Sequence, residues 1–343
     1  MKFQGPKSRW LSIVLVLLLA TTVVFQAPAG GGAEEAEPDP DAETLSLPAV
    51  SIGGAGTAGT FYVMAVGFAD LFSSEFGANA VGEVTGGSVE NARLLRDRSV
   101  ELATMQLGVT QDARQGIRNF EGDDPIEIYT MIPVYPEGAQ IITLADSDIN
   151  SISDLEGKTL AVGSPGSGIL AFTELFLETF DISFDDINPE YLSFSEATTA
   201  FRDGTIDAMI ANTAAPAPFA MDLETTHDIK LIGMSDDEIE FFTSQHEQFY
   251  EGFIPGTAYD SIDEDVPTVV GWVVLNAHPD IPEQDAYLMT KALMENREAL
   301  MDVHQSAQWI NLDSVEAIMG AGVPFHPGAA RYYAEQGLTV PTP

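Results

Sequence analysis

One unit recurs three times in this chain and constrains its fold: an apolar run of strand length, a turn of glycines and hydroxyl residues, and a segment with helical periodicity. The first unit contains the run SIGGAGTAGTFY at residues 51–62, and the other two have their turns at residues 85–91 and 164–168. Strands that alternate with helices in this way predict a parallel sheet with crossover helices. The fold class that we predict is therefore α/β.

The order of the apolar runs indicates two lobes between which the chain crosses twice. Two β-branched runs lie within residues 126–144, and prolines and a glycine interrupt them near residues 135–140, where we expect the first crossing. The chain is expected to return after Pro255, with a buried strand over residues 266–275 and an amphipathic helix over residues 282–300. The predicted lobes are residues 49–137 plus 256–343, and residues 138–255.

The first 29 residues have the layout of a secretory signal peptide, with Lys2, Lys7 and Arg9 before an apolar run and a small-residue motif that ends at Ala29. The apolar run is short for a membrane span, and an uncleaved anchor is the alternative that remains open. Residues 30–48 contain few large apolar side chains, which predicts a flexible acidic tether. We expect an exported protein at the periplasmic or extracellular face of the cytoplasmic membrane.

The charge balance excludes several classes of partner. The chain has 53 Asp and Glu against 14 Lys and Arg, a net charge of -39, which disfavours nucleic acid and anionic membrane surfaces. Such an acidic surface stays hydrated in concentrated salt, where the Debye length is about 3 Å at 1 M, so a halophilic source and an ordinary acidic secreted protein are both hypotheses. The absence of cysteine from the sequence excludes disulfides and thiolate metal sites.

The glycines of the first unit have a second interpretation. Gly54, Gly56 and Gly59 fit the dinucleotide-binding pattern G-x-G-x-x-G, and Glu83 ends the second predicted strand, where a ribose-binding acid would lie. Against this interpretation, the strand before the glycines is short, export removes the chain from nicotinamide cofactors, and no group for hydride transfer stands out. A dinucleotide-binding oxidoreductase is kept as an alternative.

Other catalytic and metal-binding motifs are incomplete. The run that starts at Asp146 imitates a calcium loop, but Ser151 and Gly157 replace its essential glycine and its final glutamate. Residues 157–159 resemble the end of a P-loop, yet they precede a predicted strand and the first glycine of the motif is missing. The five histidines lack metal-binding spacing, and no Gly-x-Ser-x-Gly elbow is present. We expect no catalytic residue, cofactor or metal, with an exported enzyme or sensor on the same fold as the alternative.

The three turns share a chemistry that suits anions. Each places backbone amides and hydroxyl groups at the start of a predicted helix, and a helix N-terminus favours a small anion. Glycines let a ligand approach the backbone, while hydroxyl groups donate hydrogen bonds without a fixed charge. Any one turn alone could be an ordinary strand-to-helix loop. Three such turns in two lobes predict a site between the lobes that closes on a small anion.

Several longer motifs carry a family resemblance. They are GAGTAGTFY at residues 54–62, TGGSVEN at 85–91, VGSPGSG at 162–168, SFSEA at 193–197, DGTIDA at 203–208 and HPGAARYYAEQG at 326–337. With these motifs the chain resembles, over residues 49–337, the TAXI solute-binding proteins of tripartite ATP-independent periplasmic (TRAP) transporters. The resemblance implies a two-lobed, type II-like periplasmic-binding-protein fold. It also implies a non-enzymatic monomer that captures a small organic anion and delivers it to a TRAP-type membrane permease.

The resemblance also implies which residues contact the ligand, to which we add Asn212. The predicted ligand-binding residues are Thr57, Ala58, Gly59, Thr60, Tyr62, Ser88, Asn91, Gln106, Pro165, Gly166, Ser167, Gly168 and Asn212. Two departures from the family pattern bear on the ligand: Ala58 stands where glycine is usual, and residues 107–108 are Leu-Gly where Ser-Asp is common. The missing carboxylate removes a partner for an amino group, so we expect a dicarboxylate or 2-oxoacid, with a glutamate-like ligand left open.

Overall fold

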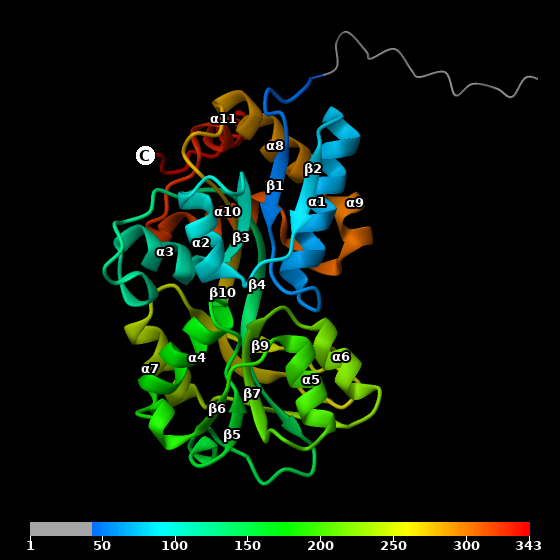
Figure 1. Ribbon diagram of the computed structural model, residues 1–343, viewed down its shortest axis with the longest axis vertical. Helices are drawn as coiled ribbons and strands as arrows, with labels where there is room; N and C mark the ends of the chain where they lie inside the picture. The colour runs from blue at the N-terminus through cyan, green and yellow to red at the C-terminus, as the bar shows by residue number, and fades with distance from the viewer. Residues whose placement is uncertain (1–42) are drawn as a thin grey trace, which may run out of the picture. The chain divides into compact units, whose positions relative to one another are not determined.

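The computed structural model describes residues 43–343 (Figure 1). The predicted signal peptide and the first part of the predicted tether lie outside the described residues. The last part of the tether contacts the folded body: Leu45 and Leu47 pack against its hydrophobic core, and Ser46 donates backbone and hydroxyl hydrogen bonds of 3.0 and 2.8 Å to the Asp285 carboxylate. The body therefore begins before residue 49, because these residues bury apolar side chains.

Strands and helices alternate through most of the described chain. The strands are β1 (Val50–Gly53), β2 (Ala80–Glu83), β3 (Leu102–Gln106), β4 (Tyr129–Leu144), β5 (Thr159–Ala161), β6 (Asn188–Glu190), β7 (Ala208–Thr213), β8 (Ile229–Ile232), β9 (Tyr250–Ile254) and β10 (Val266–Ala277). The α-helices are α1 (Thr60–Phe76), α2 (Ser88–Arg96), α3 (Leu107–Gln115), α4 (Gly168–Thr179), α5 (Phe194–Arg202), α6 (Pro218–Glu224), α7 (Asp236–Gln245), α8 (Glu283–Glu295), α9 (Arg297–Val303), α10 (Leu312–Ile318) and α11 (Pro327–Glu335). Short 3-10 helices are η1 (Arg118–Phe120), η2 (Ile152–Leu155), η3 (Phe184–Asp186), η4 (Gln305–Trp309) and η5 (Met319–Ala321). Within residues 43–343, no helix has both the length and the apolar composition that a membrane span needs.

One mixed sheet joins the strands in the order β2-β1-β3-β10-β4-β7-β5-β6, with β8 paired to β4 and β9 paired to β10. The pairs β1 with β2 and β3, and β5 with β6 and β7, are parallel, as the recurring strand–turn–helix units predict. The pair β4 and β10 is antiparallel because its two strands pass between the lobes in opposite directions. The predicted α/β class with two crossings is confirmed.

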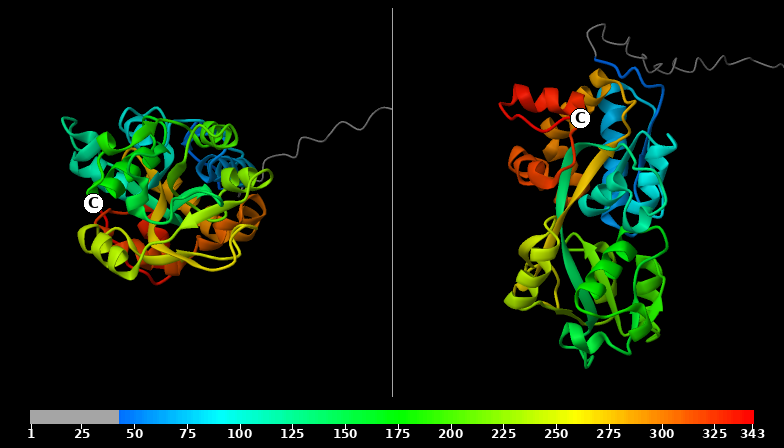
Figure 2. Two further views of the ribbon diagram at one scale, coloured as in Figure 1. Left: turned by 90° about the horizontal axis from the view of Figure 1, so that it is seen from below. Right: turned by 90° about the vertical axis from the view of Figure 1, so that its left-hand side faces the viewer.

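The two crossings lie inside β4 and β10, which run side by side through both lobes (Figure 2). On β4, Tyr135 belongs to the core of the first lobe and Ala139 to that of the second, which matches the crossing expected near residues 135–140. On β10, Val269 belongs to the second lobe and Trp272 to the first. The return therefore lies near residue 270 rather than at residue 256, and Tyr259 packs in the second lobe.

The ladder between β4 and β10 is irregular near the crossings. Pro136 lies opposite Trp272, and Pro133 lies opposite Val274. A register shift occurs between Val273 and Val274, and a second one follows Leu275. Since proline has no N–H group, these positions of β4 donate no ladder hydrogen bond.

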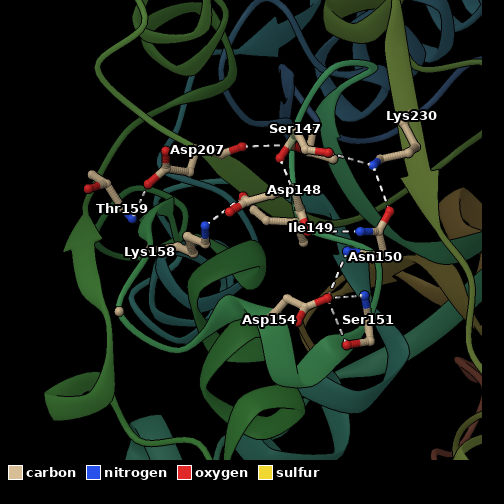
Figure 3. A network of polar contacts seen from close by, with 12 residues as sticks. Ser147, Asp148, Ile149, Asn150, Ser151, Asp154, Lys158, Thr159, Asp207 and Lys230 are labelled. Atoms are coloured by element: carbon tan, nitrogen blue, oxygen red, sulfur yellow. Dashed lines mark hydrogen bonds and ion pairs between the residues drawn. The ribbon is translucent and has the colours of Figure 1, made fainter.

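The segment that imitates a calcium loop forms a polar network of another kind (Figure 3). The Asp154 carboxylate accepts hydrogen bonds from the backbone amides of Asn150 and Ser151, at 2.9 and 3.0 Å. Lys158 pairs with Asp148 at 2.6 Å, and Lys230 donates to the Asn150 side chain at 3.1 Å. These acids and lysines therefore fix a turn, and the described part of the chain holds no group of three or more His, Cys, Asp or Glu arranged for a metal ion.

Candidate functional site

A cavity of about 290 Å³ lies between the two lobes, where the N-termini of four helices meet. Helices α1 and α2 come from the first lobe, and α4 and α5 come from the second. The lining residues are 55–61, 84–88 and 192–195, together with Gln106, Gly163, Ser164, Ser167, Gly168, Ile169, Met209, Asn212 and Thr213.

The two first-lobe helices begin without a capping side chain. Gly59 precedes α1 and Gly87 precedes α2, and neither glycine can offer a side-chain oxygen to the first-turn amides. Gly87 has φ of 109°, which favours glycine over residues with a side chain. At the start of α2, however, the Glu90 amide donates to the Gly166 carbonyl at 3.1 Å, and the Glu90 carboxylate accepts a hydrogen bond of 2.8 Å from the Gly86 amide. The amides at the start of α1 are therefore the ones most available to an anionic ligand.

The two second-lobe helices supply their own caps. Ser167 Oγ accepts a hydrogen bond of 3.0 Å from the Leu170 amide at the start of α4. At the start of α5, Ser193 and Glu196 form a capping box, with the Glu196 carboxylate 2.6 Å from Ser193 Oγ. The Ser-x-x-Glu pattern is visible in the sequence and could have predicted the N-terminus of α5. That pattern does not reveal that this N-terminus faces the cavity.

The lobes touch each other around the cavity. The Glu90 amide of α2 donates to the Gly166 carbonyl at 3.1 Å, and Gln106 Nε2 donates to the Asn212 carbonyl at 3.4 Å. A methyl group on Gly168 would overlap Gln106 Oε1 and come within 2.7 Å of Ser88 Oγ. A side chain at residue 168 would therefore displace the Gln106 and Ser88 side chains, so glycine favours the close approach of the start of α4 to the first lobe.

Two polar atoms of the cavity wall lack hydrogen-bond partners. Thr60 and Asn212 are each only 2% exposed, and neither Thr60 Oγ1 nor Asn212 Oδ1 makes a hydrogen bond of good geometry within the described protein, although the Thr60 hydroxyl lies near that of Tyr135 and opposes the rise that burial causes in the pKa of Tyr135. Buried polar atoms of folded proteins nearly always have a partner. A ligand in the cavity would supply the missing partners.

A buried carboxyl group lies on β4 beside the cavity. Glu137 is 1% exposed, its Oε1 accepts a hydrogen bond of 2.8 Å from Asn212 Nδ2, and its Oε2 has no hydrogen-bond partner among residues 43–343. Burial raises the pKa of Glu137 well above its usual value, although the Gln106 side chain opposes the shift. A small second cavity of about 30 Å³, lined in part by these three residues, has room for about one or two water molecules. Glu137 is not among the ligand-binding residues predicted from the sequence.

The structure brings most of the predicted ligand-binding residues together. Those that line the cavity are Thr57, Ala58, Gly59, Thr60, Ser88, Gln106, Ser167, Gly168 and Asn212. Tyr62, Asn91, Pro165 and Gly166 are not among the lining residues.

The four residues outside the lining have other surroundings. Asn91 is fully buried and its Nδ2 donates to the carbonyls of Gly54 and Thr104, at 2.7 and 2.9 Å, so it fixes the turn after β1. Gly166 accepts the interlobe hydrogen bond from Glu90, and Pro165 precedes it in that turn. On α1 it is Phe61, not Tyr62, that lines the cavity, because successive residues of a helix face different directions.

The apolar part of the cavity wall is not among the residues predicted from the sequence. It consists of Phe61, Val84, Ile169, Leu192, Phe194 and Met209. Leu192 and Phe194 flank or lie within the SFSEA motif, which marked the segment without indicating its contact with the other turns. Non-local packing brings these residues together, so local periodicity gives no signal for them.

No residue that lines the cavity carries a formal charge, among those that the structure describes. Cationic side chains pair with acids elsewhere: Arg98 lies 2.7 Å from Asp280, and Arg331 lies 3.2 Å from Glu283. Positive potential in the cavity therefore comes from helix termini and amides rather than from Lys or Arg.

Solved structures with a similar fold come from several bacteria. A protein of Bordetella bronchiseptica RB50 has a TM-score of 0.50 at 15% identity, covering 85% of this chain and 90% of that one. The periplasmic aliphatic sulphonate binding protein SsuA from Escherichia coli has a TM-score of 0.47 at 16% identity, with 84% and 79% covered. The GluR0 ligand-binding core from Nostoc punctiforme, in complex with L-glutamate, has a TM-score of 0.46 at 14% identity, with 74% and 97% covered. Similarity at such low identity concerns the fold alone.

The sequence comparison identifies the family more directly. The fold class predicted from the sequence, a two-lobed α/β fold like that of type II periplasmic binding proteins, is confirmed. The model of the NMT1-like family matches residues 52–337, which is most of the chain. The chain therefore belongs to the NMT1-like family.

Proposed function

We propose that this protein is an exported, monomeric solute-binding protein that captures a small organic anion between its lobes. The observation that carries the proposal is the meeting of four helix N-termini, from both lobes, at a cavity whose described lining residues carry no charged side chain. Helix termini stabilise anions through amides and dipoles, and no counter-ion is then needed. The TAXI-like motifs support delivery of the ligand to a TRAP-type membrane permease.

Binding would be coupled to closure of the lobes. The ligand would contact turns from the first lobe, at residues 55–60 and 85–88, and from the second lobe, at residues 163–168. Contacts to both lobes form together only in the closed state, so a ligand that makes them shifts the population toward closure. The direct interlobe hydrogen bond from the Glu90 amide to the Gly166 carbonyl also stabilises the closed state.

A dinucleotide has less support as the ligand. The turn after β1 is held by Asn91, and the starts of α2 and α4 lie against each other beside it. The remaining cavity, about 290 Å³, is at the lower limit of pockets for drug-sized ligands, and a dinucleotide is larger than these.

The proposal is tested by calorimetric titration of small carboxylates and of their neutral amides. Carboxylates should bind and amides should not. Thr60→Val should weaken carboxylate binding by about 1–3 kcal/mol, because the replaced hydroxyl lines the cavity, is buried and makes no hydrogen bond of good geometry within the described residues.

Thr290→Val is the matched control, since Thr290 Oγ1 is also buried and unpartnered but lies on α8, away from the cavity. It should leave the affinity unchanged. Equal effects of the two substitutions, or equal binding of acids and amides, would remove the basis for an anion site between the lobes.

A further inference from the structure

We infer that the ligand is a monocarboxylate with a largely apolar body of roughly ten to twelve non-hydrogen atoms, rather than a dicarboxylate or an amino acid. The inference rests on the proposed function, because it names the ligand class of the same cavity. Three features carry it: the position of the free amides, the apolar wall and the size of the cavity.

The amides without a side-chain cap belong to the first lobe. Serine side chains cap α4 and α5, whereas α1 and α2 begin at Gly59 and Gly87 without a side-chain cap. At α2 the Glu90 amide is already bonded to the Gly166 carbonyl and the Glu90 carboxylate to the Gly86 amide, so the start of α1 has the larger share of free donors. The two uncapped termini are neighbours in the first lobe: Thr85 Oγ1 donates to the Gly54 carbonyl at 3.0 Å, which ties the α2 turn to the turn that leads into α1. Thr60, a lining residue whose hydroxyl makes no hydrogen bond of good geometry within the described residues, is the first residue of α1. One acid group therefore satisfies the free donors.

The second lobe presents an apolar wall to the rest of the ligand. Ile169, Leu192, Phe194 and Met209 are part of that lobe's hydrophobic cluster or pack against it. The Phe194 ring stacks on Phe219 with 4.2 Å between centroids and an interplanar angle of 9°, so its orientation is fixed before a ligand arrives. An apolar body would displace water from this wall, which favours binding.

A second charge on the ligand would have no partner. A second carboxylate would lose its water against the apolar wall without an Arg or Lys among the described lining residues to compensate. An ammonium group would likewise find no Asp or Glu in that lining. Glu137 is the nearest buried acid on β4, but it is not a lining residue, and its Oε1 is already bonded to Asn212.

The cavity volume limits the size of the ligand. About 290 Å³ is about twice the roughly 150 Å³ of a cavity that holds benzene in a protein core. An aryl ring with a short carboxylated chain has this size, and 3-phenylpropanoate is a suitable probe.

Calorimetric titration of the full chain with three matched probes tests the inference. They are 3-phenylpropanoate, 3-phenylpropan-1-ol without the charge, and 3-(4-carboxyphenyl)propanoate with a second charge at the far end. The first should bind at least tenfold more tightly than each of the others, and at least tenfold more tightly than 2-oxoglutarate or glutamate.

Two variants locate the apolar body. Phe194→Ala should weaken the binding of 3-phenylpropanoate at least tenfold, because the ring forms part of the wall. Phe253→Ala is the control, since Phe253 is 56% exposed on β9 and is not a lining residue, and it should leave the affinity within twofold.

The outcomes separate this inference from the proposed function. Tighter binding of 2-oxoglutarate, glutamate or the dicarboxylated probe would overturn the monocarboxylate class and leave an anion-binding protein. Binding of the alcohol as tightly as the acid, or of no carboxylate at all, would overturn the anion site itself and with it the proposed function.

Discussion

Replacing Glu137 by Gln tests the electrostatics of the strand that crosses between the lobes. The substitution preserves the shape of the side chain and its ability to accept the 2.8 Å hydrogen bond from Asn212 Nδ2. It removes an ionisable carboxyl group from a side chain that is 1% exposed and whose Oε2 makes no hydrogen bond within the described residues. The variant therefore isolates the cost of a buried carboxylate.

The sign and size of the effect follow from linkage. Burial raises the pKa of Glu137 in the folded state above the value of 4.5 that describes the unfolded chain, so the folded protein holds a proton that the unfolded protein has released. The resulting contribution to stability is complete below pH 4.5 and is lost as the pH rises toward the folded-state pKa. For one proton the slope is about 1.4 kcal/mol of unfolding free energy per pH unit.

Urea unfolding of the wild type and of Glu137→Gln between pH 5 and pH 8 measures this slope. Asp112, whose pKa burial raises to about 6, is present in both proteins, so its contribution cancels in the difference between them. The difference should grow by about 1.4 kcal/mol per pH unit, and the pH at which it stops growing reports the folded-state pKa.

Glu251→Gln, at an exposed position on β9, is the control and should retain the wild-type pH dependence. A constant difference between the wild type and Glu137→Gln across this pH range would refute the reasoning, since it would mean that Glu137 titrates alike in both states.

Three further predictions concern other parts of the molecule. Asn91→Ala should lower the unfolding free energy by about 2 kcal/mol or more in urea titrations, because buried carbonyls of Gly54 and Thr104 lose their donor; an unchanged midpoint would contradict the structural role assigned to Asn91. Gly168→Ala should reduce ligand affinity at least tenfold in calorimetry, because the added methyl group overlaps Gln106 Oε1. Gly320→Ala is the control, since its added methyl group meets no atom within 4 Å, and it should leave the affinity unchanged. Equal affinities of the two variants would be inconsistent with close contact between the lobes. The unfolding temperature should rise between 0.1 and 2 M KCl, since salt screens repulsion in a chain with a net charge of -39; a fall over this range would argue against the halophilic hypothesis.

The parts of the fold that sequence reasoning predicted well depend on local signals. The turns before Thr60, Ser88 and Gly168 were recognised because glycine and hydroxyl residues mark helix starts within a few residues. The first crossing was found because prolines and a glycine interrupt β4. These features need no knowledge of distant parts of the chain.

The parts that were missed depend on non-local packing. The return to the first lobe lies inside β10, whose residues from Thr268 onward are all buried, so its apolar run does not reveal where one core ends and the other begins. Tyr259 remains in the second lobe because its hydroxyl donates to Gln140 at 2.6 Å, across 119 residues of sequence. The buried acid Glu137 and the wall around Phe194 likewise become part of the site only when both lobes are assembled.

The paired crossings of β4 and β10 determine how the lobes can move. Pro133 and Pro136 each remove one ladder donor from this two-stranded ribbon, and Pro136 lies between Tyr135 of the first-lobe core and Ala139 of the second, where the chain leaves one lobe for the other. The resting angle between the lobes is thus a property of this ribbon and is separate from the ligand contacts. Changes at Pro136 would therefore multiply the dissociation constants of all ligands by one common factor, because they alter the fraction of molecules that are closed before binding.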